Sequence, residues 1–413
     1  MELKKADGNI YKLIEAEKIR QSEGLEMIAS ENYVSEAVLE ATGSILTNKY
    51  AEGYPGKKYY SGCEFIDQIE NIAIERLKKL FGCKFANVQP HCGSSANMAA
   101  YLAVAKAGDR ILGQSLDAGG HLTHGAKVSF SGQIFESFSY GLDPNTGLLD
   151  YGEVEKIAKK VKPKVIMCGF SAYPRAIDFK KFKKIAKSVN AVLIADIAHI
   201  AGLVAAGYHQ SPVGVADIVT STTHKTLRGP RSGIIMTNDE ELAKKIDKVV
   251  FPGIQGGPLE HVIAAKAVSF GEALKPQFKK YIENVLGNMK VFAKTLMAFD
   301  FDLVSGGTDN HLILVDLRSK NLTGKDFAHA LHEAGITVNK NSVSNDPQPP
   351  MITSGVRVGT AALTTRGMGI AEMQRIAEMF NAVAENISDD KELQKISKEV
   401  KQMCKKFPVP GIK

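Results

Sequence analysis

Residues 191–199 read Ala-Val-Leu-Ile-Ala-Asp-Ile-Ala-His, and residues 222–230 read Thr-Thr-His-Lys-Thr-Leu-Arg-Gly-Pro. The apolar run that ends at Asp196 predicts a buried strand, which would carry this carboxylate to the edge of a sheet. A lysine that condenses with an aldehyde needs a pocket that lowers its pKa, and the pyridinium nitrogen of pyridoxal phosphate needs a carboxylate beside it. Asp196 and Lys225 are therefore of the right types to bind that cofactor.

The surroundings of Lys225 weigh against simpler interpretations of these two residues. A lysine is most often a solvated surface charge, and an aspartate after a strand is most often a turn or a helix cap. Here small hydroxylated residues precede Lys225, and Arg-Gly-Pro-Arg follows at 228–231. Polar groups so dense beside a predicted strand favour a lined pocket over an open surface.

Short apolar runs alternate with amphipathic segments through the middle of the chain. This alternation predicts an α/β fold with a mostly parallel central sheet that is covered on both faces. Ligands of such sheets bind at the carboxyl ends of the strands, where Asp196 and the Lys225 segment would lie. A helix with one apolar face is expected over 179–189. The expected strands are Phe85-Ala86-Asn87-Val88, Val165-Ile166-Met167-Cys168, residues 191–195, residues 217–220 and Gly233-Ile234-Ile235-Met236.

The pattern along the chain predicts three regions. Residues 1–30 are expected to form an N-terminal helical arm, residues 31–275 a large cofactor-binding domain, and residues 276–413 a smaller α+β domain. The elements expected in the last region are a helix over 281–299, a strand over 311–316, a helix over 327–332 and a strand over 356–359.

Composition and charge limit the class of protein. The 413 residues include 44% hydrophobic and 23% charged residues, as in ordinary globular proteins. The net charge is +7, and the densest basic stretch, 391–406, has the spacing of an amphipathic helix, so no nucleic-acid partner is expected. No apolar N-terminal segment is present, and no run approaches the roughly 20 apolar residues of a membrane span. We therefore expect a cytoplasmic protein without a membrane partner.

The cysteines and histidines predict neither disulfides nor a metal site. The five cysteines are widely spaced, with no C-x-x-C pair, which is typical of a reducing compartment. The ten histidines form no cluster with the spacing of metal ligands.

Two glycine-rich turns could approach a phosphate. Gly93-Ser94-Ser95 follows a predicted strand and opens a helix, so backbone N–H groups and the positive helix end could bind an anion. A serine there is also a routine helix cap. The turn Gln255-Gly256-Gly257-Pro258 could contact a phosphate or a neighbouring subunit, or it could be a plain turn.

Seven stretches spread over nearly the whole chain share their order and spacing with one known family. The stretches are Ala29-Ser30-Glu31-Asn32, residues 49–57 (Lys-Tyr-Ala-Glu-Gly-Tyr-Pro-Gly-Lys), residues 119–125 (Gly-Gly-His-Leu-Thr-His-Gly), Asp196-Ile197-Ala198-His199, residues 222–226, Gln255-Gly256-Gly257-Pro258, and residues 353–360 (Thr-Ser-Gly-Val-Arg-Val-Gly-Thr). In this arrangement the chain resembles the serine hydroxymethyltransferase (glycine hydroxymethyltransferase) family, and its length is that of the bacterial or archaeal form.

The resemblance implies a fold, an assembly and a reaction. The fold would be fold type I of pyridoxal-phosphate enzymes, as in aspartate aminotransferase, in a homodimer whose active sites are shared between subunits. The reaction would be reversible conversion of serine and tetrahydrofolate, or a related pterin, to glycine and 5,10-methylenetetrahydrofolate. Aldol cleavage of other β-hydroxy amino acids would be a side activity.

The resemblance also implies roles for individual residues. In the cofactor site these are Lys225 as the Schiff-base lysine, Asp196 at the pyridinium nitrogen, His121 stacked on the ring, His199 and Ser171 at its substituents, Gly93 and Ser94 at the phosphate, and Tyr50, Gly256 and Gly257 from the neighbouring subunit. In the substrate site they are Arg357 and Ser30 at the carboxylate, Tyr60 from the neighbouring chain and Glu52 as the acid–base carboxyl. The implied catalytic set is Lys225, Glu52, His224 and Tyr60, and the folate site would contain Leu116, Gly120, His121, Leu122 and Asn341.

Two departures from the family pattern are visible. Cys92 stands where a serine usually precedes the phosphate turn, which weakens one possible phosphate contact but not the site, because Gly93 and Ser94 remain. Asp117-Ala118 replaces a pair that often contains histidine, beside the expected folate residue Leu116.

Two other classes of protein remain as alternatives. One is a folate-independent enzyme on the same scaffold, either a β-hydroxy-amino-acid aldolase or an α-methylserine hydroxymethyltransferase. The other is a basic RNA-binding protein with a vestigial enzyme fold, although a binding protein has no need of Lys225, Asp196 and Arg357 together.

Overall fold

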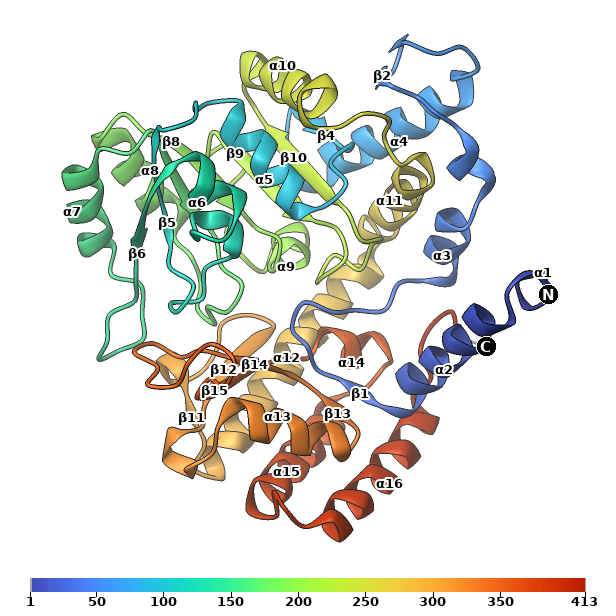
Figure 1. The fold of residues 1–413 in the computed structure, drawn as a ribbon, viewed down its shortest axis with the longest axis vertical. Coiled ribbons are helices and arrows are strands. Elements are labelled where there is room, and N and C mark those ends of the chain that lie inside the picture. The colour runs from blue at the N-terminus through green and yellow to red at the C-terminus, as the bar shows by residue number, and fades with distance from the viewer. Residues whose placement is uncertain (1, 413) are drawn as a thin grey trace.

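A seven-stranded sheet forms the centre of the upper tier of the computed structural model, which describes residues 2–412 (Figure 1). Its strand order is β4-β10-β9-β8-β7-β5-β6. Strand β10 is antiparallel to both of its neighbours, and all other pairs in the sheet are parallel, which confirms the predicted α/β fold with a mostly parallel sheet. The strands are β4 (Phe85–Asn87), β5 (Arg110–Gln114), β6 (Glu136–Tyr140), β7 (Val165–Cys168), β8 (Val192–Asp196), β9 (Ile218–Thr222) and β10 (Gly233–Thr237).

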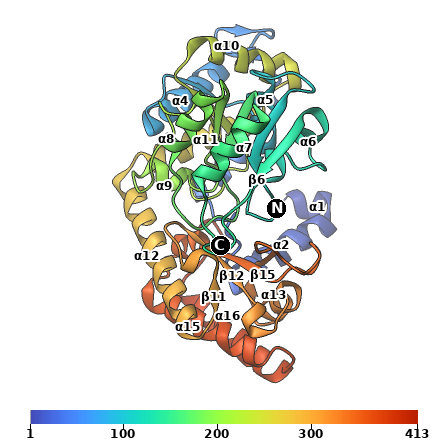
Figure 2. The ribbon, with the colours of Figure 1, turned by 90° about the vertical axis from the view of Figure 1, so that its left-hand side faces the viewer.

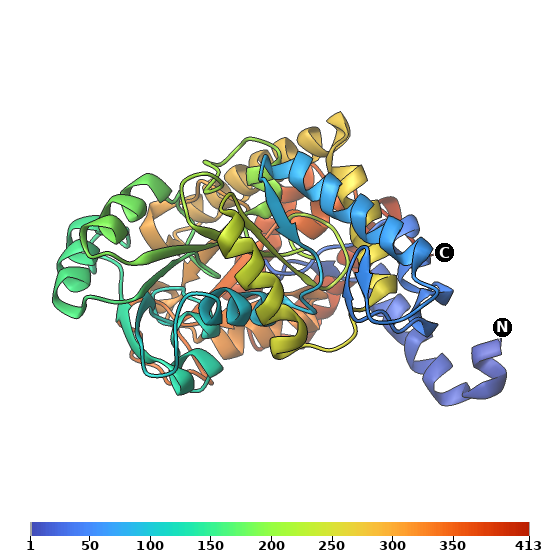
Figure 3. The ribbon, with the colours of Figure 1, turned by 90° about the horizontal axis from the view of Figure 1, so that it is seen from above.

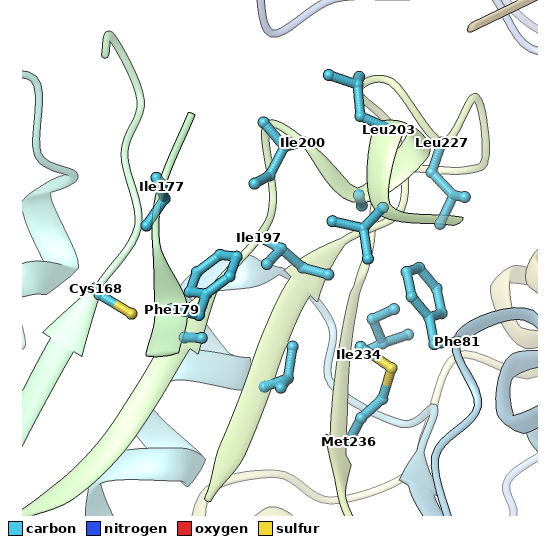
Figure 4. Close-up of a cluster of buried hydrophobic side chains, with 14 of the residues drawn as sticks. Phe81, Cys168, Ile177, Phe179, Ile197, Ile200, Leu203, Leu227, Ile234 and Met236 are labelled. Carbon is cyan, nitrogen blue, oxygen red and sulfur yellow. The ribbon is translucent and has the colours of Figure 1, made fainter. Parts of the chain in front are cut away.

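Helices cover both faces of this sheet, because alternate side chains of its strands enter two separate cores. In β7, Ile166 and Cys168 pack into a core shared with α4, α7 and α8, whereas Met167 packs with α5 and α6. Part of the first core is drawn in Figure 4, where Phe81 lies near Ile234. The helices of this tier are α3 (Glu36–Thr42), α4 (Glu64–Phe81), α5 (Gly93–Leu102), α6 (Phe130–Ile134), α7 (Tyr151–Val161), α8 (Phe179–Ser188), α9 (Ala201–Ala205), α10 (Glu240–Lys248) and α11 (Glu260–Ala273).

A four-stranded antiparallel sheet of order β11-β12-β15-β14 forms the lower tier (Figures 1 and 2). The long helix α12 (Pro276–Ala298) runs from the upper tier into it. Phe292 of α12 packs edge-on against Phe380, which also contacts Phe327 in the same core. The remaining elements here are β11 (Asp302–Leu303), β12 (Leu312–Asp316), α13 (Gly324–Glu333), β13 (Ile336–Thr337), β14 (Asn339–Asn341), β15 (Gly355–Gly359), α14 (Ala361–Thr365), α15 (Ile370–Glu385) and α16 (Asp390–Lys406).

The N-terminal segment begins as two helices that project from the body (Figure 3). These are α1 (Glu2–Ala6) and α2 (Gly8–Glu23), and neither buries a residue in this chain. The helical part of the predicted arm ends at Glu23, because β1 (Leu25–Glu26) then pairs in parallel with β13 of the lower tier. A hairpin of β2 (Gly53–Tyr54) and β3 (Lys57–Lys58) follows α3.

The predicted strands and helices all form, with ends that differ by a few residues. The predicted strand over 191–195 is β8, displaced by one residue so that Asp196 is its last member, and the predicted helix over 281–299 is α12, which begins earlier at Pro276. Within residues 2–412, we find no helix that is both long and apolar enough to cross a bilayer.

Candidate active site

A cavity of about 440 Å³ lies at the carboxyl ends of the parallel strands. It is reached by residues that follow β4, β5, β7, β8 and β9, and by Arg357 of β15 from the lower tier. The structure therefore brings most of the predicted site together. The predicted residues that line this cavity are Ser30, Gly93, Ser94, Leu116, Gly120, His121, Leu122, Ser171, Asp196, His199, His224, Lys225 and Arg357.

Lys225 lies just beyond β9, with its amine directed into the cavity. Its Nζ donates a hydrogen bond to Thr222 Oγ1 at 3.0 Å. Burial lowers the pKa of Lys225 to about 8, and the positive charges of Arg357 and Arg231 act in the same direction, while Asp196 opposes them. About a tenth of this amine is therefore uncharged at pH 7, and the uncharged form is the one that a nucleophilic lysine requires.

Asp196 ends β8 and is held by a buried set of polar groups. Its Oδ2 accepts a hydrogen bond from Asn97 Nδ2 at 2.8 Å and lies 3.1 Å from His124 Nε2. Its Oδ1 accepts from the backbone N–H of Ala198 at 2.9 Å. Burial by itself raises the pKa of Asp196, but the contacts with His124 and Asn97 outweigh it and hold that pKa well below its ordinary value. The carboxylate therefore stays ionised and can pair with a protonated ring nitrogen.

Three predicted histidines surround Lys225 as neutral imidazoles. Burial lowers the pKa of His121 to about 4 and that of His224 to about 3, and it also holds the pKa of His199 well below its ordinary value. The Nδ1 atom of His224 is buried without a hydrogen-bond partner among the described residues. Neutral rings can stack on a ligand or exchange a hydrogen bond with it, without adding positive charge beside Lys225.

The turn before α5 forms a cradle for an anion. Gly93 opens this ten-residue helix, so the free N–H groups of its first turn face the cavity. A Cβ added to Gly93 would meet the Cγ2 atom of Thr222 at 2.6 Å. Glycine at this position therefore allows a close approach between the turn and the strand that precedes Lys225.

Arg357 is a buried cation that no carboxylate of residues 2–412 neutralises by an ion pair. It donates from Nη1 to the backbone oxygen of Ser171 at 2.7 Å, from Nη2 to Ser30 Oγ at 3.3 Å, and from Nε to Asn339 Oδ1 at 3.1 Å. Burial lowers its pKa to about 10, so the guanidinium is still charged at neutral pH. An unpaired buried guanidinium is suited to bind the carboxylate of an incoming ligand.

The remaining predicted residues lie elsewhere. Asn341, expected in the folate site, belongs to β14, where its side chain donates to the backbone oxygen of Ser342, and it does not line the cavity. The other five form a separate group that we call the aromatic cluster: Tyr50, Glu52, Tyr60, Gly256 and Gly257.

The aromatic cluster gathers around the carboxyl of Glu52. The hydroxyl of Tyr50 donates to Oε1 at 3.4 Å, and that of Tyr60 donates to Oε2 at 3.2 Å. The two tyrosine rings meet edge-on, and a Cβ added to Gly257 would touch the Tyr50 ring at 3.3 Å. Tyr50 and Tyr60 are 56% and 44% exposed in this chain, so this cluster presents its polar groups to the surface.

Sequence reasoning assigned no role to several residues that complete the cavity. Asn97 also donates to Thr123 Oγ1 and accepts from Thr220 Oγ1, which fixes the direction of its amide at Asp196. Arg231 and Glu31 line the cavity as well. The ring of His311 stacks against His199, with ring nitrogens 3.4 Å apart. Three of these residues lie in or beside stretches quoted above, and their positions could have identified them: Asn97 after the 93–95 turn, His124 in 119–125 and Arg231 at the end of 228–231. No neighbouring motif marks His311.

These residues fit pyridoxal phosphate on the geometry of the site itself. A lysine with a lowered pKa, a carboxylate held ionised, a helix start for a phosphate and an unpaired guanidinium for a substrate carboxylate share one cavity. No group of histidine, cysteine and acidic side chains arranged to hold a metal ion occurs among residues 2–412.

Comparison with known proteins agrees with this chemistry. The family model for serine hydroxymethyltransferase matches residues 3–380. The chain is similar to the serine hydroxymethyltransferase of Wolinella succinogenes, with 60% identity over 98% of this chain and 97% of the relative. It is also similar to those of Rickettsia canadensis, with 57% identity over 99% and 98%, and of Nitratiruptor, with 58% identity over 98% of both chains.

Proposed function

The chain belongs to the serine hydroxymethyltransferase family, and we propose how its own residues carry out the reaction of that family. The reaction interconverts serine and tetrahydrofolate with glycine and 5,10-methylenetetrahydrofolate. Pyridoxal phosphate, the cofactor of the family, supplies an electron sink for the negative charge that forms on the amino acid. The observation that carries the proposal is the shared cavity of Lys225, Asp196 and Arg357.

Within the cavity each group has a distinct task. Lys225 supplies an amine that is partly uncharged at neutral pH. Asp196, kept ionised by Asn97 and His124, holds a proton on the ring nitrogen. Arg357 and Ser30 bind the amino-acid carboxylate and so fix the orientation of the bonds that react.

The neutral side chains of the cavity complete the cofactor site in this proposal. His121 stacks on the ring, and His199 and Ser171 contact its substituents. Gly93 and Ser94 hold the phosphate at the start of α5, and His224, with its free Nδ1, can give or accept a proton beside Lys225. Leu116, Gly120 and Leu122 line the cavity and are assigned to the folate. Asn341, which lies outside the cavity in this chain, is assigned with them on the family resemblance alone.

We propose that two copies of the chain share their active sites. The support is that the aromatic cluster lies outside the cavity of its own chain, with both tyrosines partly exposed. In a dimer Tyr50, Gly256 and Gly257 of one copy would reach the phosphate of the other. Tyr60 and Glu52 would reach its substrate, where Glu52 can move a proton at the serine hydroxyl.

We further propose fold type I with the division into 1–30, 31–275 and 276–413. Separate hydrophobic cores in the two tiers support two domains, and α12, which begins at Pro276, contributes Phe278 to Val285 to the upper core and Met289 to Leu296 to the lower one. The cytoplasmic location stays a prediction from the sequence.

The change Glu52→Gln tests the role of this carboxyl. We expect folate-dependent cleavage of serine to fall by roughly 100-fold or more, because a side chain that cannot exchange a proton replaces one that can. Cleavage of 3-phenylserine without folate should fall much less, since its aldehyde product needs no capture. Steady-state rates on both substrates measure the difference.

A matched control is Glu64→Gln, which changes an exposed carboxyl at the start of α4. It should leave both rates unchanged. Full activity of Glu52→Gln on serine would remove Glu52 from the mechanism, and equal losses on both substrates would indicate a distorted site.

The pKa of Lys225 predicts how the cofactor-free protein takes up its cofactor. The amine is neutral above its pKa, so we expect the rate of pyridoxal-phosphate incorporation to rise with pH, with its midpoint at about 8. Stopped-flow absorbance at a series of pH values measures this rate. In Arg357→Gln, which lacks one of the charges that lower this pKa, the midpoint should move upward. A midpoint near the ordinary lysine value in the unsubstituted protein would contradict the prediction.

A direct assay separates folate-dependent from folate-independent members of the scaffold. Serine cleavage by the cofactor-loaded protein should depend on added tetrahydrofolate and show saturation with it. Cleavage of serine that tetrahydrofolate leaves unchanged would favour the aldolase alternative. Cleavage of α-methylserine without cleavage of serine would favour the α-methylserine hydroxymethyltransferase alternative.

A further inference from the structure

A buried ion pair joins α4 to the β2–β3 hairpin, whose first strand begins directly after Glu52. Lys58 Nζ of β3 is 2.7 Å from Glu70 Oε2 of α4, and the two side chains are only 3% and 1% exposed. Burying two charges is unfavourable unless further hydrogen bonds satisfy them. The partners of those further hydrogen bonds identify the part of the backbone that the ion pair stabilises.

The additional hydrogen bonds go to the backbone on both sides of Glu52. Lys58 Nζ donates to the carbonyl of Ala51 at 3.3 Å and to that of Gly53 at 3.2 Å. Gln89 Nε2 donates to the same Gly53 carbonyl at 2.9 Å and to Glu70 Oε1 at 2.7 Å. The carbonyl groups of the two residues that flank Glu52 are therefore hydrogen-bonded to one buried unit.

The same unit reaches the glycine turn and the approach to the phosphate turn. The side chain of Gln255, which precedes Gly256, donates to the backbone oxygen of Gln89 at 2.9 Å and accepts from the N–H of His91 at 3.0 Å. His91 stands two residues before Gly93. Lys266, also fully buried, donates to the carbonyls of the residues at 88, 90 and 233.

We infer that Lys58, Glu70 and Gln89 are positioning residues, which fix the backbone on both sides of Glu52 and, through Gln255, the Gly256–Gly257 turn, so that the chain presents both groups to its partner in one set arrangement. The inference rests on the proposed function, because it assumes that Glu52 handles a proton in the partner's cavity. None of the three residues lines the cavity of its own chain, so they act through the backbone that they hold.

The changes Gln89→Met and Lys58→Met test the inference in the cofactor-loaded enzyme. Gln89→Met keeps the volume and leaves the ion pair intact, while it removes both donated hydrogen bonds. Because a displacement of about 1 Å at a catalytic group can cost up to 100-fold, we expect folate-dependent serine cleavage to fall by at least about tenfold relative to folate-independent 3-phenylserine cleavage. The visible absorbance of the bound cofactor should not change, because the Lys225 pocket is untouched.

The matched control is Lys183→Met, which breaks the Lys183–Asp217 ion pair of 2.6 Å at the opposite end of β8 from the cavity. It should lower the thermal midpoint without altering the ratio of the two activities. A ratio that stays unchanged in Gln89→Met and in Lys58→Met, while Glu52→Gln lowers it, would overturn the inference and leave the proposed function intact. If Glu52→Gln itself leaves the ratio unchanged, the proposed role of Glu52 and the inference fail together.

Discussion

Lys225→Ala is expected to reduce serine cleavage by roughly 1000-fold or more, because no other amine of the cavity can take the place of Lys225. The three neighbouring histidines are neutral imidazoles, and the guanidinium of Arg357 keeps its charge. The variant should still retain pyridoxal phosphate, since the start of α5 and the ionised Asp196 are unchanged. Turnover by the cofactor-loaded variant is the measurement.

Borohydride reduction provides the control for this prediction. It should fix the cofactor permanently on residue 225 of the unsubstituted protein, as peptide mass analysis would detect, and it should label no lysine in Lys225→Ala. Normal turnover by the loaded variant, or labelling of a different lysine in the unsubstituted protein, would contradict the assignment.

The central sheet could be predicted from the sequence because its strands are buried on both faces. A run such as residues 165–168 is apolar throughout, and such runs stand out from their surroundings. Strands β5 (Arg-Ile-Leu-Gly-Gln) and β6 (Glu-Ser-Phe-Ser-Tyr) were not predicted. Both lie near one edge of the sheet and mix polar with apolar residues, so neither stands out as an apolar run. The pairing of β1 with β13, in which Leu25 lies opposite Ile336, could not be predicted from the sequence either, because a two-residue strand leaves no periodic pattern.

Some residues of the candidate site could likewise be placed from the sequence, and others could not. Residues that follow predicted strands, such as Asp196 and Lys225, could be placed because the carboxyl ends of parallel strands meet at one edge. The contact of His124 with Asp196 depends on a short turn after β5 whose path the sequence does not specify. His311 comes from the other tier, and only the packing of the two tiers brings its ring against His199.

The cavity and the aromatic cluster lie apart within one chain, and this separation matters most for function. The family resemblance implied both groups and a contribution from the neighbouring subunit, whereas the separation of the two groups within one chain depends on tertiary structure. The carboxyl of Glu52, to which we assign the acid–base role, lies outside the cavity of its own chain, so in this proposal a second copy completes the site. We therefore expect that mixing Lys225→Ala and Glu52→Gln protomers restores part of the activity, through heterodimers with one intact site.

Arg357→Lys is expected to behave as a severe change, although both residues carry a positive charge. The guanidinium of Arg357 is oriented by Ser171, Ser30 and Asn339, and a lysine amine cannot make the same planar set of contacts. Loss of one arm of a two-point carboxylate contact in a buried site should cost about 2–4 kcal/mol, which is roughly 30- to 1000-fold in kcat/KM. Steady-state kinetics with serine measures this loss.

The cofactor absorbance of Arg357→Lys should remain that of the unsubstituted enzyme, because the defect lies in substrate binding. Arg375→Lys is the matched control: this arginine lies on α15, pairs with Glu378 and Glu399 at the surface, and should tolerate the change without a kinetic effect. An unaltered KM for serine together with a disturbed cofactor band would instead place Arg357 at the cofactor. Arg357 contributes to the lowered pKa of Lys225 only through its charge, which a lysine at position 357 preserves. The geometry of Arg357 therefore predicts weak serine binding together with an undisturbed cofactor.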